Sequence, residues 1–571
     1  MSATNPLVTA RIPTALTAAV EELLALSRSD AVGERLRRGD ATLWAPPGTP
    51  EVADRLGWLT IAERMTGQLE EILSFAEEVR EQGFTDIVLL GMGGSSLAPE
   101  VLRRSFGHRA GRPRMHVLDS TDAAAIRAVE GAIEPARTLF VVSSKSGGTI
   151  EPLSLFAHFH ALVGTGANFV AITDPGSGLQ ALASEHGFRR TFAGDPNIGG
   201  RYSALSAFGI VPGALMGVDV RGLLEGAPDA WETSLAEGSA EPRPEAAVWL
   251  GAALSGLARA GRDKLTFVIA ETLPGLGLWL EQLVAESTGK HSRGILPVAD
   301  EPLADPAAYG SDRVFAYLPD LGAPDPAQEA GVLALADAGH PLITIPTTGP
   351  RDLGRIFLLA EIAVAVTGWG LRINPFDQPN VQQAKDATKR VLAEYEQRRE
   401  LPAPALAGAE ALRALLLGAT PGEYVALMGY LQPGDAFDQA VAELRLAVMG
   451  STGATTTFGY GPRFLHSTGQ FHKGGPPSGR FLQLLHDGPL DVDIPGAPYT
   501  FDILKEAQAI GDLETLHGLE RPAERVRLSG DDPSAALRAL TAEVTAHSAG
   551  GRTDAGAGAG EGAGSSQASR R

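Results

Sequence analysis

Two glycine- and serine-rich stretches contain residue types that could bind an anion. The first, Gly91-Met92-Gly93-Gly94-Ser95-Ser96, follows the apolar residues 87–90. The second, Ser143-Ser144-Lys145-Ser146-Gly147-Gly148-Thr149, follows the apolar residues 139–142. Both patterns predict a buried strand, a tight turn and the start of a helix. Glycines let a ligand approach the backbone, and the N–H groups and dipole of a helix N-terminus favour negative charge.

Each stretch also has a purely structural explanation. The first could be an ordinary strand-to-helix turn, because it lacks the Lys-Ser/Thr of a Walker loop and does not complete G-x-G-x-x-G. The hydroxyls of the second could merely cap the following helix. A cap needs only a side chain or two, whereas this stretch holds four hydroxyls, Lys145 and two glycines. We therefore predict that the second stretch binds an anion.

Two further stretches could supply catalytic groups. Arg201 follows Gly199 and Gly200, and a guanidinium beside small residues can reach a substrate oxyanion, although a surface arginine in a turn would give the same pattern. Gln282 and Glu286 are four residues apart in a predicted helix, so they share one face. A carboxylate and an amide there could flank a substrate, and a solvated glutamate is the alternative.

The elements that must position these residues alternate between short apolar runs and helical patterns. In the first part, strands are predicted at 87–90, 116–118, 139–142 and 169–173, with helices at 96–106, 121–130, 149–163 and 178–185. The alternation resumes with strands at 265–270, 314–318 and 342–346, and helices at 275–288, 327–338 and 353–367. This order implies parallel strands with right-handed crossovers, and therefore two doubly wound α/β domains that bind ligands at the carboxyl ends of their strands.

We predict five segments along the chain. They are a helical N-terminal segment (1–80), a first α/β domain (81–225), a second α/β domain (226–395), a C-terminal extension (396–547) and a tail (548–571). The second domain begins with an acidic, linker-like stretch over about 226–243. The extension has a mixed pattern with two glycine-dense loops, which indicates an α+β unit. The tail is nearly all small and polar, cannot bury enough apolar surface to order itself, and is predicted to be disordered.

Composition and charge narrow the classes of partner. The 571 residues are 44% hydrophobic and 20% charged, which is typical of a soluble globular protein. A net charge of -20 disfavours nucleic acid and membrane surfaces, so a phosphorylated ligand would need a locally positive pocket. The absence of cysteine excludes disulfides, thiolate metal sites and a cysteine nucleophile. With no basic and apolar N-terminal segment and no apolar run of about 18 residues, we expect a cytoplasmic protein.

Several stretches together resemble the glucose-6-phosphate isomerases. Over residues of about 85–390 they follow that family's order: Gly91-Met92-Gly93-Gly94-Ser95, Ser144 through Thr149, Gly199-Gly200-Arg201-Tyr202-Ser203, Glu286-Ser287-Thr288-Gly289-Lys290, and Asn374-Pro375-Phe376-Asp377-Gln378 with Lys385. The resemblance implies two sugar-isomerase (SIS-type) α/β domains. The C-terminal stretches Gly459-Tyr460-Gly461-Pro462 and His466 through Gly475 resemble the isomerase half of actinobacterial transaldolase/glucose-6-phosphate isomerase fusions.

The resemblance also implies an activity and a role for each matched residue. The activity is aldose–ketose isomerisation of glucose 6-phosphate and fructose 6-phosphate through a cis-enediol. Glu286 would be the base, and Arg201 with Gly200 would stabilise the enediolate oxygens. The residues that would bind the sugar phosphate or close the pocket are Gly94, Ser95, Ser144, Lys145, Ser146, Thr149, Gln282, Gln378 and Lys385. This route needs no metal and no cofactor; a sugar phosphate is the expected partner, and the family's homodimer is an open expectation.

One residue of the family pattern is absent. The histidine that opens the sugar ring corresponds here to Asp312-Arg313, and arginine stays charged at working pH. The C-terminal glycine-rich loop offers two histidines instead. We predict that this loop folds over the pocket and supplies the ring opener, with His466 ahead of His472; the alternative is that both are surface histidines of a mobile loop.

Two other functions stay open at this point. The same loops could serve a sugar-phosphate-binding regulatory protein without catalysis. An isomerase could also act on mannose 6-phosphate, since the stereochemistry at C2 depends on details of the pocket. A regulator needs the phosphate-binding loop but neither a base nor an enediolate stabiliser, so the presence of both Glu286 and Arg201 favours the enzyme.

Overall fold

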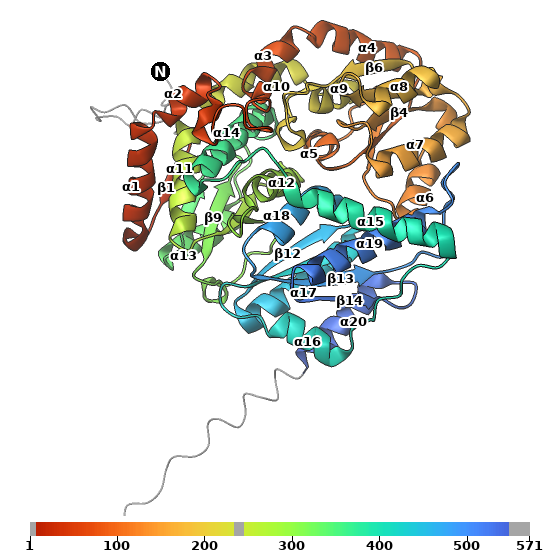
Figure 1. Ribbon diagram of the computed structural model, residues 1–571. Coiled ribbons are helices and arrows are strands. Elements are labelled where there is room, and N and C mark those ends of the chain that lie inside the picture. The colour runs from red at the N-terminus through yellow and green to blue at the C-terminus, as the bar shows by residue number, and fades with distance from the viewer. Residues whose placement is uncertain (1–6, 233–244, 547–571) are drawn as a thin grey trace, which may run out of the picture.

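The computed structural model describes residues 7–232 and 245–546, which form three β-sheets covered by helices (Figure 1). The predicted tail and most of the predicted linker over 226–243 lie outside the described residues. The units built on the three sheets surround helix α12 (Leu276–Thr288), which carries Gln282 and Glu286 and lies near the centre of the view. The chain thus places the proposed catalytic helix where all three units can contact it.

The first sheet confirms the predicted parallel α/β domain. Its strand order is β3-β2-β4-β5-β6, and every pair is parallel. The strands are β2 (Asp86–Gly91), β3 (Arg114–Leu118), β4 (Thr138–Ser143), β5 (Phe169–Thr173) and β6 (Arg190–Ala193). The helices are α5 (Leu97–Phe106), α6 (Ala123–Ala132), α7 (Ile150–Val163), α8 (Gly178–Glu185), α9 (Ala207–Leu215) and α10 (Val220–Gly226). The edge strand β6 was not predicted, because its half-polar sequence carries no apolar run.

The second sheet has the same central order and an added edge. Strands β8, β7, β9 and β10 are parallel neighbours in that order, and β1 pairs antiparallel with β10. The strands are β1 (Thr9–Arg11), β7 (Lys264–Ile269), β8 (Leu296–Val298), β9 (Arg313–Leu318) and β10 (Leu342–Thr344). Besides α12, its helices are α11 (Ala246–Arg259), α13 (Pro326–Asp337) and α14 (Leu353–Leu371). The N-terminal segment is therefore not purely helical: β1 precedes α1 (Thr14–Ser29), α2 (Val32–Arg37), α3 (Ile61–Thr66) and α4 (Leu69–Glu81).

The C-terminal unit corrects the prediction of an α+β extension. Its four strands are all parallel, in the order β12-β11-β13-β14, so it is a third α/β unit. The strands are β11 (Tyr424–Tyr430), β12 (Thr455–Tyr460), β13 (Gly479–Leu485) and β14 (Ala523–Arg527). The helices are α16 (Ala409–Leu417), α17 (Asp435–Thr452), α18 (Gly469–Gly474), α19 (Phe501–Gly518) and α20 (Pro533–Thr545). The sequence does not reveal this parallel sheet, because its edge strands β12 and β14 begin Thr-Thr-Thr and Ala-Glu-Arg and lack the apolar run of a buried strand.

All three sheets share one strand order: the second strand, the first, the third and the fourth. The order reverses between the first and third strands, and such a switch point opens a crevice at the carboxyl ends. In the first sheet this point lies between β2 and β4, where Gly91 is paired with Ser143. The fold therefore brings the two glycine- and serine-rich stretches side by side.

Helix α15 (Pro379–Arg398) connects the second and third units and packs along α19 of the C-terminal unit. Its Val391 and Leu392 join an apolar cluster that also contains residues of the first sheet and of α19. The boundary proposed near 395 falls inside this helix, so the domain limits given above stay a proposal.

One helical stretch, Pro350–Leu371, is long and apolar enough to cross a bilayer by length and composition alone. Its most apolar window has a mean hydropathy of 1.5, but 94% of that window is buried inside the protein. The stretch includes α14, which packs against α11 and α12. It is therefore a core helix of the second unit.

Candidate active site

The two glycine- and serine-rich stretches lie next to each other at the switch point of the first sheet. The Ser143 hydroxyl donates to the Ser95 carbonyl oxygen at 3.0 Å, which ties the loops together. A Cβ atom on Gly94 would lie 2.1 Å from the Gly200 carbonyl oxygen, so only glycine fits at this contact. The glycines of the first stretch thus allow the Gly200–Arg201 segment to approach the backbone directly.

The second stretch forms a compact loop at the start of α7. The Ser144 hydroxyl donates to Thr149 Oγ1 at 3.1 Å and accepts from the Gly147 N–H at 3.2 Å. Thr149 occupies the N-cap position of α7, yet its side chain makes no capping hydrogen bond. Thr149 therefore does not cap the helix through its side chain, so the explanation that this hydroxyl serves only as a cap does not hold. The backbone N–H groups at the N-terminus of α7 can bind an anion.

Lys145 differs from the expected arrangement. Its ammonium forms an ion pair with Asp174 and donates to the Asp195 carbonyl oxygen at 2.9 Å. These partners follow β5 and β6, so the positive charge is engaged there rather than standing free over the start of α7. Ser146, by contrast, is exposed and accepts from the Gly148 N–H at 3.5 Å. The loop would therefore hold an anion through hydroxyls and backbone N–H groups.

Arg201 and Glu286 meet at the buried centre. Glu286 Oε1 lies 3.3 Å from Arg201 Nη1, and the Arg201 side chain is only 1% exposed. Each guanidinium nitrogen has a partner: Nε donates to Ser287 Oγ at 2.7 Å, Nη1 to Gln378 Oε1 at 2.9 Å, and Nη2 to the Pro375 carbonyl oxygen at 2.5 Å. The positive charge is thus fixed beside the carboxylate rather than free to swing away.

Gln282 links the carboxylate to the C-terminal loop, as its spacing on α12 allows. Its Nε2 donates to Glu286 Oε2 at 3.0 Å and to the His466 carbonyl oxygen at 2.8 Å. Its Oε1 is buried and has no partner among the described residues. An unpartnered acceptor beside the carboxylate suits a hydroxyl group of a ligand.

His466, in the turn η10 (Arg463–His466), forms a second acid–base pair close to the first. Its Nε2 lies 2.9 Å from Glu151 Oε1 on α7, and Gln508 Nε2 donates to the same oxygen at 2.7 Å. Burial acts to raise the pKa of Glu151, but the charge and hydrogen bond of His466 outweigh it and lower that pKa, with Lys385 acting in the same direction. The imidazole is therefore held by a carboxylate, as in many proton-transfer sites.

Buried ion pairs fix the C-terminal unit over the first sheet. Arg463 donates to both oxygens of Asp119, each at 2.7 Å, and Lys505 Nζ lies 2.9 Å from Asp122 Oδ2. Both aspartates follow β3, at the carboxyl edge of the sheet. These acids position the loop that carries His466.

His472 and Lys385 lie outside the direct contacts of this centre. His472 is buried within the C-terminal unit, where its Nδ1 is 3.0 Å from the Tyr424 hydroxyl, and burial lowers its pKa to about 3. It packs against Phe481 rather than against Glu286. His472 is therefore a poor ring opener, which corrects the prediction that it could take this role as the second choice after His466. Lys385 is exposed and acts on Glu151 through its charge. Gln378, by contrast, accepts a hydrogen bond directly from Arg201.

Arg313, which stands where the resemblance implied a ring-opening histidine, makes structural contacts. Arg313 is completely buried and pairs with Glu301 at 2.7 Å. The same carboxylate accepts from Thr456 Oγ1 at 3.2 Å, which ties the second unit to the C-terminal unit. No proton-transferring group is offered by Arg313.

Sequence reasoning missed three residues that complete the centre. Glu151, two residues after Thr149, received no role, Ser287 stood unassigned beside Glu286, and Gln508 lies far along the chain on α19. The Ser-x-x-x-x-Thr-x-Glu spacing could have indicated Glu151, since it lies in the first turn of α7. Gln508 has no local signal.

This fold and centre define an α/β protein with parallel sheets and a buried carboxylate–guanidinium pair. A family model for phosphoglucose isomerase matches residues 60–295. The chain is 30% identical over 413 residues to a glucose-6-phosphate isomerase of Rubrobacter xylanophilus, covering 63% of this chain and 92% of that protein. It is also 30% identical over 381 residues to the glucose-6-phosphate isomerase of Trichormus variabilis, covering 58% and 72%. The chain belongs to the phosphoglucose isomerase family.

Two solved structures have a similar fold. A hypothetical protein from Thermus thermophilus is 29% identical and aligns with a TM-score of 0.56 over 67% of this chain and all of its own. A glucose-6-phosphate isomerase from Chlamydia trachomatis, at 17% identity and a TM-score of 0.50 over 66% of this chain and 86% of its own, shares the fold. These matches leave about a third of this chain without a counterpart.

Glu281 precedes Gln282 on α12 and gives a testable pH dependence of stability. Burial raises the pKa of this carboxyl to about 8, from an ordinary value of 4.5, against the opposing hydrogen bond from the Ala299 N–H. Between these two values the folded state binds one proton more than the unfolded state, so the free energy of unfolding falls as pH rises. Glu281→Gln should abolish this pH dependence. Between ~pH 5 and ~pH 8, the free energy of unfolding of the variant should therefore rise by more than about 1 kcal/mol relative to that of the wild type. Urea unfolding of both proteins at these two pH values measures the difference. If the unfolding free energies of the two proteins changed equally with pH, the prediction would be wrong.

Proposed function

We propose that this protein is an aldose–ketose isomerase that interconverts glucose 6-phosphate and fructose 6-phosphate. The observation that carries the proposal is the buried contact of Glu286 with Arg201 and Gln282. The His466 carbonyl oxygen accepts from the same Gln282, and the His466 imidazole pairs with Glu151. A regulatory protein would need an anion-binding loop but no such pairs. Family membership and the named relatives support the same activity.

The residues suit a proton-transfer route. With the open-chain sugar phosphate bound, Glu286 would remove the proton from C2 and return it to C1 of the cis-enediol. Arg201 would stabilise the negative charge that develops on the enediolate oxygens, and Gln378 is the side-chain partner that could yield its hydrogen bond to them. Gln282 would orient a substrate hydroxyl through its unpartnered Oε1.

Purified protein in a coupled assay with fructose 6-phosphate tests the activity, with mannose 6-phosphate as a second substrate. Turnover of the first alone supports the proposal, and turnover of both supports the dual isomerase. Binding of fructose 6-phosphate without turnover would instead establish the regulatory protein.

The phosphate group should bind at the loop that begins α7. Replacing Ser144 and Thr149 together by alanine should raise KM more than about tenfold, because each lost charge-assisted hydrogen bond costs about 1.5–3 kcal/mol. Initial rates across fructose 6-phosphate concentrations give KM. Ser184→Ala, an exposed serine of the same unit, is the control and should leave KM unchanged. An unaltered KM in the double variant would remove this loop from the site.

We also propose that the C-terminal unit relates this chain to the isomerase half of the transaldolase fusions, on the motifs at 459–462 and 466–475. In this chain that unit brings His466 to the centre from the same polypeptide. With His466 as the ring opener, the site would need no histidine from a partner, and the homodimer stays an alternative assembly. Sedimentation velocity, with activity measured on dilution through the same concentrations, should show a monomer with full activity; activity confined to a dimer would contradict this.

A further inference from the structure

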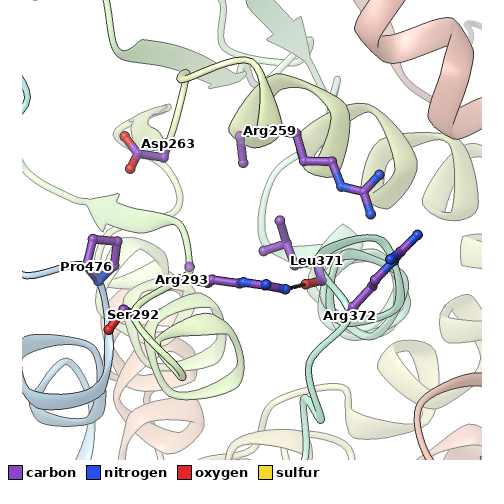
Figure 2. A pocket seen from close by; sticks show the side chains of 9 residues that line it. Arg259, Asp263, Ser292, Arg293, Leu371, Arg372 and Pro476 are labelled. Carbon is purple, nitrogen blue, oxygen red and sulfur yellow. Dashed lines mark hydrogen bonds between the residues drawn. The ribbon is translucent and has the colours of Figure 1, made fainter.

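Three arginines from separate segments line a pocket of about 510 Å³ on the second unit (Figure 2). They are Arg259 at the end of α11, Arg293 in the loop after α12, and Arg372 directly after α14. We call this the arginine pocket. The other lining residues are Ala258, Asp263, Ser292, Gly294, Leu371 and Pro476.

The positive charge of the arginine pocket is not neutralised by neighbours. Within residues 7–232 and 245–546, none of the three guanidinium groups forms an ion pair, and Arg293 Nη1 donates only to the Leu371 carbonyl oxygen, at 3.1 Å. Asp263 does line the pocket, but its carboxylate points away from the arginines in Figure 2 and pairs with Lys264 at 2.6 Å. Partial burial lowers the pKa of Arg259, and the charges of Arg372 and Arg293 lower it further against the opposing charge of Glu22. In a chain of net charge -20, the arginine pocket thus presents three guanidinium groups without an ion-pair partner among the described residues.

The chemistry of three guanidinium groups selects a class of ligand. Each guanidinium presents several N–H donors in a planar fork, which matches the oxygens of phosphate or carboxylate. A carboxylate has two oxygens in one plane, whereas a phosphate dianion offers three outer oxygens in different directions and twice the charge. The geometry points to a phosphate-bearing small metabolite as the ligand of the arginine pocket, bound apart from the substrate site.

The position of the pocket connects it to the proposed active centre. Its lining comes from four segments, and three of them contact or lead to residues of the proposed centre. Arg293 lies beyond Glu286 on the segment after α12, and Lys290 of that segment donates to the Asn374 carbonyl oxygen at 2.5 Å. Arg372 precedes Pro375, whose carbonyl oxygen accepts from Arg201.

The third segment completes the connection. The Ser292 N–H donates to the Gly474 carbonyl oxygen at 3.0 Å, and Gly474 ends the short helix α18 that follows His466. A phosphate that draws Arg293 and Arg372 together would therefore fix the segments that hold Glu286, Arg201 and His466. We expect occupancy of the pocket to change kcat; this coupling rests on the proposed function, whereas the binding itself does not.

Isothermal titration calorimetry with inorganic phosphate, in chloride buffer at constant ionic strength, tests phosphate binding to the arginine pocket. The background is the Ser144→Ala/Thr149→Ala protein, so that the substrate loop does not contribute. Adding Arg259→Gln and Arg372→Gln should weaken the remaining phosphate binding by at least about tenfold. Arg38→Gln, an exposed arginine away from the pocket, should leave it unchanged. If the double arginine variant does not fold, Arg259→Gln alone serves, with thermal melting as the check on folding.

Three outcomes would overturn the site: no phosphate binding in the loop-variant background, equal binding after the arginine substitutions, or acetate bound as tightly as phosphate. The coupling has its own readout. At saturating fructose 6-phosphate, competition at the substrate site disappears, so a remaining effect of phosphate on kcat that is lost in Arg259→Gln/Arg372→Gln supports it. Phosphate binding without any effect on kcat would overturn the coupling alone. If the protein had no isomerase activity, the titration would still show whether the arginine pocket binds phosphate. The failure of the proposed function can therefore be distinguished from the failure of the proposed site.

Discussion

Glu286→Gln is expected to lower kcat by about 10²–10⁴-fold while KM stays near the wild-type value. The substitution keeps the shape of the side chain and its place between Arg201 and Gln282, but it removes the group that can accept a proton. Glutamine in this position would face the Gln282 amide donor with its own amide, which costs about one neutral hydrogen bond, or roughly 0.5–1.5 kcal/mol. The fold and substrate binding should therefore survive.

Steady-state kinetics with fructose 6-phosphate measure the effect, and exchange of the C1 and C2 protons with solvent follows the chemistry directly. Glu281→Gln is the matched control, because Glu281 precedes Gln282 on α12 but accepts from the Ala299 N–H, away from Arg201. We expect the control to keep kcat within a few-fold of wild type. Near-full turnover in Glu286→Gln, or no proton exchange in the wild type, would exclude an enediol route with this base.

The local parts of the centre could be predicted from the sequence. Gln282 and Glu286 needed only helical spacing, and the loops after β2 and β4 needed only the pattern of an apolar run followed by glycines and hydroxyls. The switch point then follows from the parallel order, since β2 and β4 are neighbours in the sheet. These features depend on short-range rules.

The remaining parts depend on contacts between distant segments. His466 meets Glu151 across 315 positions and Gln508 meets it across 357, and neither distance leaves a pattern in the chain. Lys145 shows the same limit, because its charge alone could not reveal that Asp174 would engage it. His472 and His466 look alike in the glycine-rich loop, and only the packing of α18 against β11 and β13 buries one of them.

His466→Ala should slow isomerisation of cyclic glucose 6-phosphate by about 10²-fold or more, with a much smaller effect on an open-chain analogue. Ring opening requires a proton to leave the C1 hydroxyl and another to reach the ring oxygen. An imidazole can do both near neutral pH, and the Glu151 carboxylate at 2.9 Å holds the ring in one orientation. The His466 carbonyl oxygen accepts from Gln282, which also donates to Glu286, so the imidazole lies on a turn that contacts the same side chain as the base.

Two variants separate this role from a structural one. Glu151→Gln keeps the hydrogen bond but removes the negative charge, so it should shift the pH profile for the cyclic sugar and leave that for the open-chain analogue in place. His472→Ala opens a cavity beside Tyr424 and Phe481, and it should lower the melting temperature without favouring either form of the sugar. An equal loss on both forms in His466→Ala would assign the residue to positioning of the loop. Full activity of His466→Ala on the cyclic sugar would exclude His466 as the ring opener. No other histidine of the described residues contacts Glu151 or Gln282, so ring opening would then fall to solvent or to a group other than a histidine at these contacts.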